Sequence, residues 1–234
     1  SLDHAKEITP LPGWMNGISA YSMWWVLIHR DLYQHQGDIA YLKQQRKYLI
    51  ELLDLLISKT KDNKENLDGT RFLDWPSSEN PQGVHAGLQA MMVMTLDAGA
   101  TLCTILDEPA QAKKCKEVSA KLKTYVPDPN GSKQAASLMA IAGLIDPKKA
   151  NQDVIAVGDC ERFSTFYGYY MLQAKAGAKD YSGALDCIRN YWGGMLDMGA
   201  TTFWEDFDLN WTKNAAPIDE VVPAGKDDIH GDFG

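Results

Sequence analysis

The chain has 234 residues, and its 23 lysines and arginines against 31 aspartates and glutamates give a formal net charge of −8 at pH 7. This charge argues against a nucleic-acid partner, because a run of phosphates would find no neutralising cations. The apolar fraction of 45% is that of a protein with a packed core and excludes wholesale disorder. No stretch approaches the roughly 20 apolar residues of a membrane span, so no membrane partner is predicted.

Apolar residues recur at helical spacing along most of the chain, and no period-2 pattern predicts a strand. Gly37-Asp38 combines a helix-ending glycine with a helix-capping aspartate, and Pro109 and Pro147 each fit the first turn of a helix. A further helix is expected to begin within residues 199–208. The other helices are predicted over residues 20–36, 39–59, 84–106 and 109–126, from 132, from 147, over 164–177, and from 180 to about 194.

The predicted helices alternate in character along the chain. Those that begin near residues 20, 84, 132 and 164 are apolar or small around most of their circumference, whereas each helix that follows them has one charged face. A helix that is apolar all round is buried on every side, and an amphipathic helix has one face in water. The alternation predicts an all-α fold with two concentric layers, an (α/α) toroid or part of one. An open solenoid is the second choice, because its repeats would have a fixed length.

Short turns join the two helices of each pair, and longer segments connect one pair to the next, so the long segments are expected to share one end of the toroid. Tryptophans and carboxylates occur together in two of these segments, one with Asp74 and Trp75, the other with Trp204 and Glu205. Aromatic faces that stack on sugar rings, beside carboxylates that bind hydroxyl groups, are typical of a carbohydrate site. The alternative is that these tryptophans pack as lids over the helix ends.

Glu205 follows an apolar pair and precedes two more acids, Asp206 and Asp208. Crowded carboxylates raise one another's pKa values, which suits general acid–base catalysis, but a solvated acid at a helix start would have the same spacing. His85 is expected to take part in core or rim packing. The four cysteines form no C-x-x-C pair and no cluster with histidine, so neither a metal nor a cofactor is predicted.

Three segments of the sequence have the form of family motifs. Residues 199–205 are Gly-Ala-Thr-Thr-Phe-Trp-Glu, residues 72–76 are Phe-Leu-Asp-Trp-Pro and lead into Val-His-Ala-Gly-Leu-Gln-Ala, and residues 16–21 are Asn-Gly-Ile-Ser-Ala-Tyr. All three resemble segments of glycoside hydrolase family 78, the α-L-rhamnosidases. Residues 199–205 resemble the segment that carries the catalytic base, and residues 72–76 resemble the loop before the third inner helix together with that helix. Residues 16–21 resemble the segment that follows the general-acid loop. The resemblance covers nearly the whole chain.

The resemblance implies an (α/α)6 barrel that hydrolyses terminal α-L-rhamnosides with inversion. Inverting enzymes use one carboxyl to protonate the leaving oxygen and a second, about 6.5–9.5 Å away, to activate a water. By its position Glu205 is implied as this base, Trp75 and Trp204 as the lining of the sugar pocket, and Asp74 as a ligand of a hydroxyl group. Trp14 and His230 are further candidates for substrate binding. The expected partner is a rhamnose-containing glycan or glycoside.

The family's general acid belongs to an acid-rich loop that has no equivalent in residues 1–12, so we expect it to lie before Ser1. The sequence begins without an initiator methionine and ends within a polar stretch. Residues 1–234 are therefore expected to be a partial (α/α)6 catalytic domain, with about eight to nine of twelve helices, of a longer polypeptide. Alone, the chain is expected to be poorly active. Its compartment stays open, with a periplasmic or extracellular location favoured over a cytoplasmic one.

Two alternatives remain open at this point. Another (α/α)6 inverting glycosidase, glucoamylase-like or trehalase-like, would use the same mechanism on a different sugar. A non-catalytic helical scaffold that binds glycan or protein at its rim would account for the helices without a complete catalytic pair. An acidic loop upstream of the chain would favour an enzyme over the scaffold.

Overall fold

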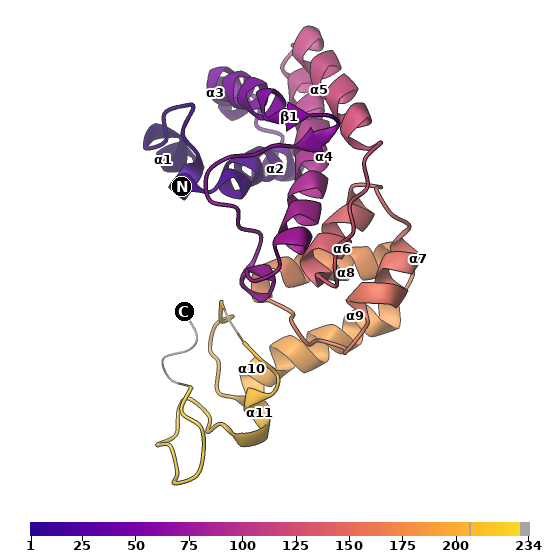
Figure 1. Ribbon diagram of the computed structural model, residues 1–234. Coiled ribbons are helices and arrows are strands. Elements are labelled where there is room, and N and C mark those ends of the chain that lie inside the picture. Colours follow the sequence, from indigo (N-terminus) through magenta and orange to yellow (C-terminus); the bar gives the residue numbers. More distant parts are fainter. Residues whose placement is uncertain (206, 230–234) are drawn as a thin grey trace. The chain divides into compact units, whose positions relative to one another are not determined.

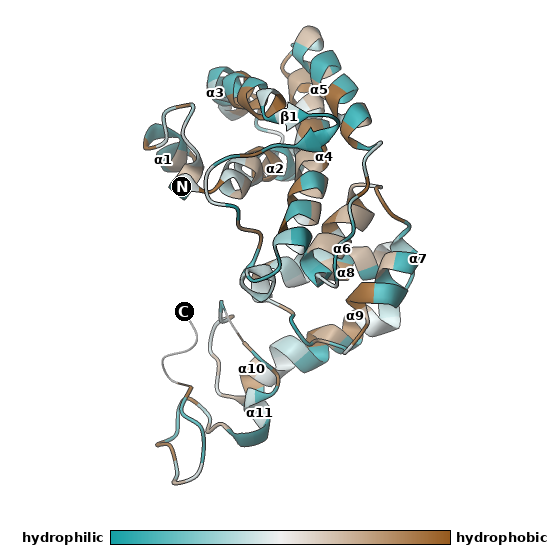
Figure 2. Cartoon of the chain, in the orientation of Figure 1, coloured by the Kyte–Doolittle hydropathy of each residue, from teal (hydrophilic) through white to brown (hydrophobic). Residues whose placement is uncertain are grey.

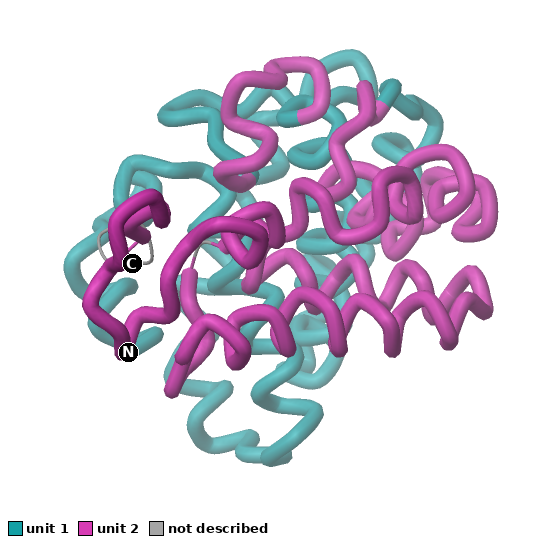
Figure 3. The backbone as a smooth tube through the Cα atoms, turned by 90° about the horizontal axis from the view of Figure 1, so that it is seen from below, with its two compact units in different colours: residues 1–73, 84–128 teal, residues 74–83, 129–234 magenta. Residues whose placement is uncertain are grey.

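Helices account for most of the chain in the computed structural model, which describes residues 1–205 and 207–229 (Figure 1). The chain divides into two units (Figure 3). Unit 1 comprises Ser1–Leu73 and Val84–Asp128, and unit 2 comprises Asp74–Gly83 and the chain from Pro129 onward. The loop that contains Asp74 and Trp75 therefore belongs to unit 2, although it interrupts unit 1 in sequence.

Unit 1 contains the two helical hairpins that the turn signals predict. Gly37 takes a left-handed φ of +66° after the first helix of one hairpin, and the Asp38 side chain accepts a hydrogen bond of 2.9 Å from the Tyr41 N–H. Glycine reaches this conformation without steric penalty, so the two residues reverse the chain. The elements of unit 1 are α1 (Leu2–Glu7), the 3₁₀-helix η1 (Met15–Gly17), α2 (Ser19–Gln36), α3 (Ile39–Ser58), the strands β1 (Thr60–Lys61) and β2 (Lys64–Glu65), α4 (Pro81–Ile105) from Val84 onward, and α5 (Pro109–Leu122).

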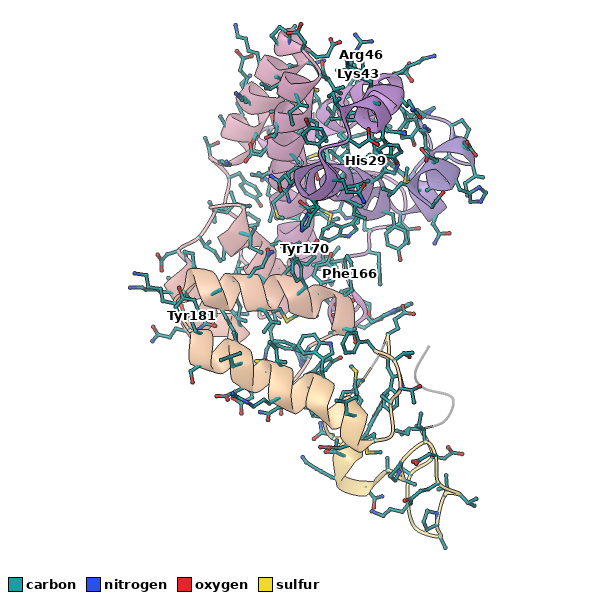
Figure 4. The ribbon with its side chains drawn as sticks, turned by 180° about the vertical axis from the view of Figure 1, so that it is seen from behind. His29, Lys43, Arg46, Phe166, Tyr170 and Tyr181 are labelled. Atoms are coloured by element: carbon teal, nitrogen blue, oxygen red, sulfur yellow. The ribbon has the colours of Figure 1, made fainter. Side chains whose placement is uncertain are left out.

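The helices of unit 1 differ in burial as their apolar patterns predict. α2 and α4 supply most of the core, with Trp25 and Met91 among its fully buried side chains. α3 and α5 alternate hydrophilic and hydrophobic residues around their axes (Figure 2), and they bury one side each. On their exposed sides Arg46 of α3, labelled in Figure 4, pairs with Glu108 at the start of α5. Unit 1 thus has a buried and a half-exposed helix in each hairpin.

α4 is long and apolar enough to cross a membrane by length and hydropathy alone, with a mean hydropathy of 1.3 over its most apolar window. The sequence was not expected to contain such a stretch. Within the protein, 78% of that window is buried. Burial of this extent is typical of a core helix, because a helix that is apolar on all sides is stable in water only when other elements pack around it.

Unit 2 is also built from helices, and they begin where the capping residues predict. The side chains of Ser132, Asp146 and Asp180 accept hydrogen bonds from backbone N–H groups in the first turn of α6, α7 and α9. α6 packs against α8. The elements of unit 2 are the 3₁₀-helix η2 (Trp75–Ser77), α6 (Lys133–Ile141), α7 (Pro147–Ala150), the π-helix η3 (Asn151–Ile155), α8 (Thr165–Gly177), α9 (Tyr181–Cys187), the π-helix η4 (Ile188–Trp192), α10 (Gly193–Asp197) and α11 (Trp211–Asn214).

The helix expected to begin within residues 199–208 is wrong for the part of that segment that the structure describes. The segment forms turns and extended backbone, and only the four-residue α11 follows it. Gly199 starts the segment with a φ of +89°, and the Asp208 carboxylate accepts a hydrogen bond of 2.8 Å from the Asn210 N–H. Such local side-chain bonds satisfy the backbone without a helix, so they compete with helix formation.

α8 departs from the expectation that it is buried all round. Phe166 and Tyr169 are exposed on it, and Phe166 and Tyr170 lie one turn apart with ring centroids 5.9 Å from each other (Figure 4). The apolar pattern cannot distinguish a helix covered on all sides from one whose aromatic residues stack on each other at the surface.

A small hairpin in unit 1 was not predicted either. β1 and β2 pair antiparallel across Asp62 and Asn63, which both have positive φ, 53° and 63°. Two left-handed residues between strands form the kind of turn whose twist matches that of a hairpin. Each strand has only two residues, too few for a period-2 pattern to be visible in the sequence.

Candidate functional site

Asp74 is the centre of a buried hydrogen-bond network in unit 2. It lies in extended backbone before η2, and its Oδ1 accepts a hydrogen bond of 3.0 Å from the Trp75 N–H. Its Oδ2 accepts two more, from Gln134 Nε2 at 3.1 Å and from Ser164 Oγ at 2.5 Å. Asp74 is only 7% exposed, and a buried carboxylate is tolerated when donors of this kind surround it.

Gln134 extends the network to a further loop. Its Oε1 accepts a hydrogen bond of 2.8 Å from Ser77 Oγ, and its Nε2 also donates to the Arg162 carbonyl at 3.1 Å. Ser77 Oγ lies 2.8 Å from Ser132 Oγ. Buried side chains that are hydrogen-bonded to one another therefore connect η2, the start of α6 and the turn before α8.

The segment with Trp204 is anchored at the same helix start. Thr165, the first residue of α8, donates a hydrogen bond from its Oγ1 to the Trp204 carbonyl. Its neighbour Ser164 bonds to Asp74. The Asp74–Trp75 and Trp204–Glu205 segments therefore meet at the N-terminus of α8, which confirms the prediction that these two long connections lie at one end of the helices.

The four candidate residues of unit 2 differ in exposure. Trp75 is 62% exposed and Glu205 is exposed, so both side chains are open to a ligand. Trp204 is only 4% exposed, and its ring lies against Phe207 with centroids 5.7 Å apart. Trp204 thus packs under the segment that carries Glu205. An exposed indole and an exposed carboxylate beside one helix start can stack on a sugar ring and accept a proton from water.

A depression of about 310 Å³ lies next to the Asp74 network within unit 2. Gln134 and Ser132, which belong to that network, form part of its wall. Its polar character suits a ligand rich in hydroxyl groups. The lining residues are Pro76, Glu79, Asn80, Gly131, Ser132, Lys133, Gln134 and Arg162.

Two further candidates lie outside the part of unit 2 described above. Trp14 belongs to unit 1, where it is largely buried and its Nε1 donates a hydrogen bond of 2.8 Å to Asp68. His230 lies outside the described residues. Among the residues that the structure does describe, no three or more histidine, cysteine or acidic side chains gather in a way that could hold a metal ion.

The supporting residues Ser77, Gln134 and Ser164 are not predicted from the sequence. Ser164 was recognised only as a helix start, and Gln134 follows two residues after the capping Ser132. The available signal was an amide and hydroxyl groups at the ends of otherwise apolar helices, where a buried polar side chain needs a partner. Their partner, Asp74, lies 60 positions before Gln134 and 90 before Ser164, so no local pattern links them.

A second polar cluster, in unit 1, was also missed. The Glu65 side chain is 0% exposed and accepts hydrogen bonds from His85 Nδ1 at 2.5 Å, Arg71 Nη1 at 3.1 Å and the Leu67 N–H at 3.0 Å. Burial alone would raise the pKa of the Glu65 carboxyl, but the hydrogen bonds from His85, Arg71 and Leu67 outweigh it and lower the pKa to about 2. His85 is thus half-buried and hydrogen-bonded to Glu65. This position agrees with the expectation that His85 packs in the core or at its rim.

A family model described as the bacterial α-L-rhamnosidase six-hairpin glycosidase domain matches residues 4–150, more than half of the chain. Asp74 and Trp75 lie within the matched residues, whereas Trp204 and Glu205 lie beyond them. A comparison with curated protein sequences found no match.

Two solved structures share the fold. A rhamnosidase from Klebsiella oxytoca with rhamnose bound is 20% identical, with a TM-score of 0.66 over 81% of this chain and 40% of that one. A family 78 rhamnosidase of Bacillus sp. GL1 is 18% identical, with a TM-score of 0.66 over 80% of this chain and 23% of that one. This chain thus spans less than half the length of either. With the family match, these likenesses confirm the predicted all-α architecture, a partial barrel of helical hairpins.

Proposed function

The chain belongs to the family of the bacterial α-L-rhamnosidase six-hairpin glycosidase domain, and from this premise we propose that it is part of an enzyme that hydrolyses terminal α-L-rhamnosides with inversion. The bound rhamnose of the Klebsiella oxytoca protein supports a carbohydrate substrate for the present chain. Glycoside hydrolysis needs two carboxyls around the scissile bond, and in this proposal Glu205 is one of them.

The meeting of two loops at the N-terminus of α8 carries the proposal. Ser164 holds the loop with Asp74 and Trp75, and Thr165 holds the segment with Trp204 and Glu205. These two hydrogen bonds thereby anchor, at one helix start of unit 2, the segments that carry an exposed indole and an exposed carboxylate. Rigid support of this kind is what a positioned catalytic group requires.

Each residue has a distinct role in the proposed reaction. The Glu205 carboxylate takes a proton from a water molecule, and that water attacks the anomeric carbon from the face opposite the leaving group. Trp75 stacks on the sugar ring, and Asp74 accepts a hydrogen bond from a sugar hydroxyl group at the site. Trp204 remains a proposed residue of the sugar pocket, and its buried ring packs against Phe207. Trp14 and His230 remain proposed binding residues without an assigned contact.

The second carboxyl, which protonates the leaving oxygen, is proposed to come from a longer polypeptide of which residues 1–234 are one part. The two similar structures are more than twice as long as this chain, which leaves room for such a contribution. In this proposal the chain alone therefore contributes only the general base, Glu205. The substrate that binds at its site is a carbohydrate.

A substrate panel tests the function. We expect the longer polypeptide to release 4-nitrophenol from 4-nitrophenyl α-L-rhamnoside, and to leave trehalose and maltose intact. The isolated chain should bind rhamnose weakly and turn over the aryl rhamnoside at least about 100-fold more slowly, because it lacks the acid. Hydrolysis of trehalose or maltose in place of the rhamnoside would overturn the proposal in favour of another (α/α)6 glycosidase. Rhamnose binding without any turnover by the longer polypeptide would overturn it in favour of a scaffold.

A further inference from the structure

Two cations line the depression of about 310 Å³ in unit 2. Lys133, the first residue of α6, is only 5% exposed, and its Nζ donates a hydrogen bond of 2.6 Å to the Asp159 carbonyl. Arg162 lies in the turn before α8 and is exposed. Within residues 1–205 and 207–229, neither side chain forms an ion pair with a carboxylate. Neither cation has a role in the proposed hydrolysis so far.

The buried position of Lys133 is costly for a cation. Its Nζ bonds to one carbonyl oxygen and lies 5.7 Å from the centroid of the Phe163 ring. An ammonium group has three N–H donors, so the single hydrogen bond leaves donors that a ligand can use. Burial lowers the pKa of Lys133, because it penalises the charged form. Since buried charges are normally paired, a buried lysine in the wall of an open depression indicates that an anion binds there.

The acidic side chains around the two cations are unevenly distributed. Among the described residues, Glu79 is the one carboxylate that lines the depression of about 310 Å³. Lys133 and Arg162 also line a second depression, of about 190 Å³, whose walls include Asp153 and Glu161. Two cations are thus balanced by two carboxylates in the smaller depression, but by only one in the larger. Positive charge is in excess in the larger depression, and an anion is expected there.

The larger depression adjoins the proposed sugar site. Pro76, which lines it, directly follows Trp75, and Gln134, which also lines it, donates a hydrogen bond of 3.1 Å to Asp74. In the proposed reaction a terminal rhamnose occupies the sugar site. The next unit of the substrate is the leaving group, so a depression beside the sugar site is where the leaving group is expected.

From the two cations and the position of this depression, we propose that it binds the leaving group of the substrate, and that this leaving group is a sugar ring that bears a carboxylate. The inference rests on the proposed function, because it names the substrate class of the same site. The guanidinium of Arg162 suits a carboxylate, to which it can donate two parallel hydrogen bonds, and Lys133 adds a compact positive charge. The polar wall of the depression suits the hydroxyl groups of the ring.

A matched pair of disaccharides tests this proposal on the longer polypeptide. We expect kcat/KM for α-L-rhamnosyl-(1→4)-D-galacturonate to exceed that for α-L-rhamnosyl-(1→4)-D-galactose about 10-fold or more, because charge-assisted hydrogen bonds form only with the carboxylate. The preference should shrink when sodium chloride rises from about 0.05 M to about 0.5 M, because salt screens the exposed Arg162. Equal kcat/KM values for the two disaccharides would overturn this inference and leave the proposed function intact. Failure to hydrolyse any rhamnoside, the aryl rhamnoside included, would overturn the proposed function and the inference with it.

Charge variants test the residues of the depression through the ratio of these two kcat/KM values. Arg162→Gln should lower the ratio about fivefold, as expected for a charge that solvent partly screens, and Lys133→Met should lower it about 10-fold or more. Glu79→Gln should raise it about two- to threefold, because a like charge is removed. Lys113→Gln, on the exposed side of α5 in unit 1, is the control and should not change it. An unchanged ratio in the Arg162→Gln enzyme, which loses only an exposed side chain, would overturn the proposal even if Lys133→Met fails to fold.

Isothermal titration calorimetry of the chain gives a readout that does not depend on catalysis. D-galacturonate should bind at least about 10-fold more tightly than D-galactose, which differs from it only by the carboxylate. It should also bind more tightly than inorganic phosphate, which carries the charge but no ring with hydroxyl groups. Equal affinities for galacturonate and galactose would overturn the role of the two cations. Phosphate binding as tight as that of galacturonate would overturn the assignment of an acidic sugar.

Discussion

Replacement of Glu205 by glutamine in the longer polypeptide is expected to lower kcat for an aryl α-L-rhamnoside by about 10²–10⁴-fold, the contribution of a positioned general base. Glutamine keeps the size and the hydrogen-bonding reach of the side chain but cannot accept the proton of the attacking water. KM should change little, because the loss affects the transition state more than the bound substrate. Initial rates of 4-nitrophenol release over a range of substrate concentrations give both constants.

A matched control for Glu205 is Asp208→Asn in the same segment. The Asp208 carboxylate accepts hydrogen bonds from the backbone N–H and the side chain of Asn210, so its role is local and structural. We expect its kcat to stay within about threefold of the unmodified enzyme, the size of a small indirect effect. A near-normal kcat for the Glu205→Gln enzyme would remove this residue from the mechanism and leave it as a surface carboxylate.

The second large effect is expected at Glu65. The folded-state pKa of about 2 lies below the ordinary value of 4.5, so the ionised carboxylate stabilises the fold. This stabilisation is fully present above pH 4.5 and is lost as the pH falls towards 2. The difference between these two pKa values corresponds to about 2–3 kcal/mol of folding stability, once it is reduced because solvent screens the partly exposed Arg71. Glu65→Gln should therefore lower the free energy of unfolding at pH 7 by about 2–3 kcal/mol.

Urea titrations followed by circular dichroism between pH 3 and pH 7 measure this effect. The stability difference between the unmodified chain and Glu65→Gln should shrink as the pH falls below 4.5, since the carboxyl of the unfolded chain then takes up a proton while that of the folded chain stays ionised down to a pKa of about 2. Glu117→Gln is the control: Glu117 pairs with Lys113 at 3.8 Å on the exposed side of α5, and such pairs contribute about 0–1 kcal/mol. Parallel stability curves for the unmodified chain and Glu65→Gln would contradict the role of the buried cluster.

Much of the fold could be predicted because the signals that begin and end its helices are local in the sequence. Gly37 and Asp38 mark the reversal between α2 and α3, and Pro109 and Pro147 mark the first turns of α5 and α7. Each of these signals depends on the conformation of one or two residues, so a single sequence is enough to find it. The apolar pattern then separates the buried helices of unit 1 from the half-exposed ones.

The residues that support the candidate site could not be predicted, since they pair over long distances in the sequence. Asp74 meets Ser164 across 90 positions, and Glu65 meets His85 across 20. Helical spacing carries no information on such pairs. The segment after α10 shows a different limit. There Asp208 bonds to the nearby backbone, and this local bond replaces the helix that the alternation of layers predicts.

The configuration of the sugar released in the first turnovers tests the central proposal most directly. Proton NMR of the longer polypeptide acting on an aryl α-L-rhamnoside follows the anomeric signal before mutarotation mixes the two forms. An inverting enzyme whose base activates water on the face opposite the leaving group must release β-L-rhamnose first, and this is the predicted result. Release of α-L-rhamnose first would mean retention, and it would contradict the role of Glu205 as a base that activates water for direct attack.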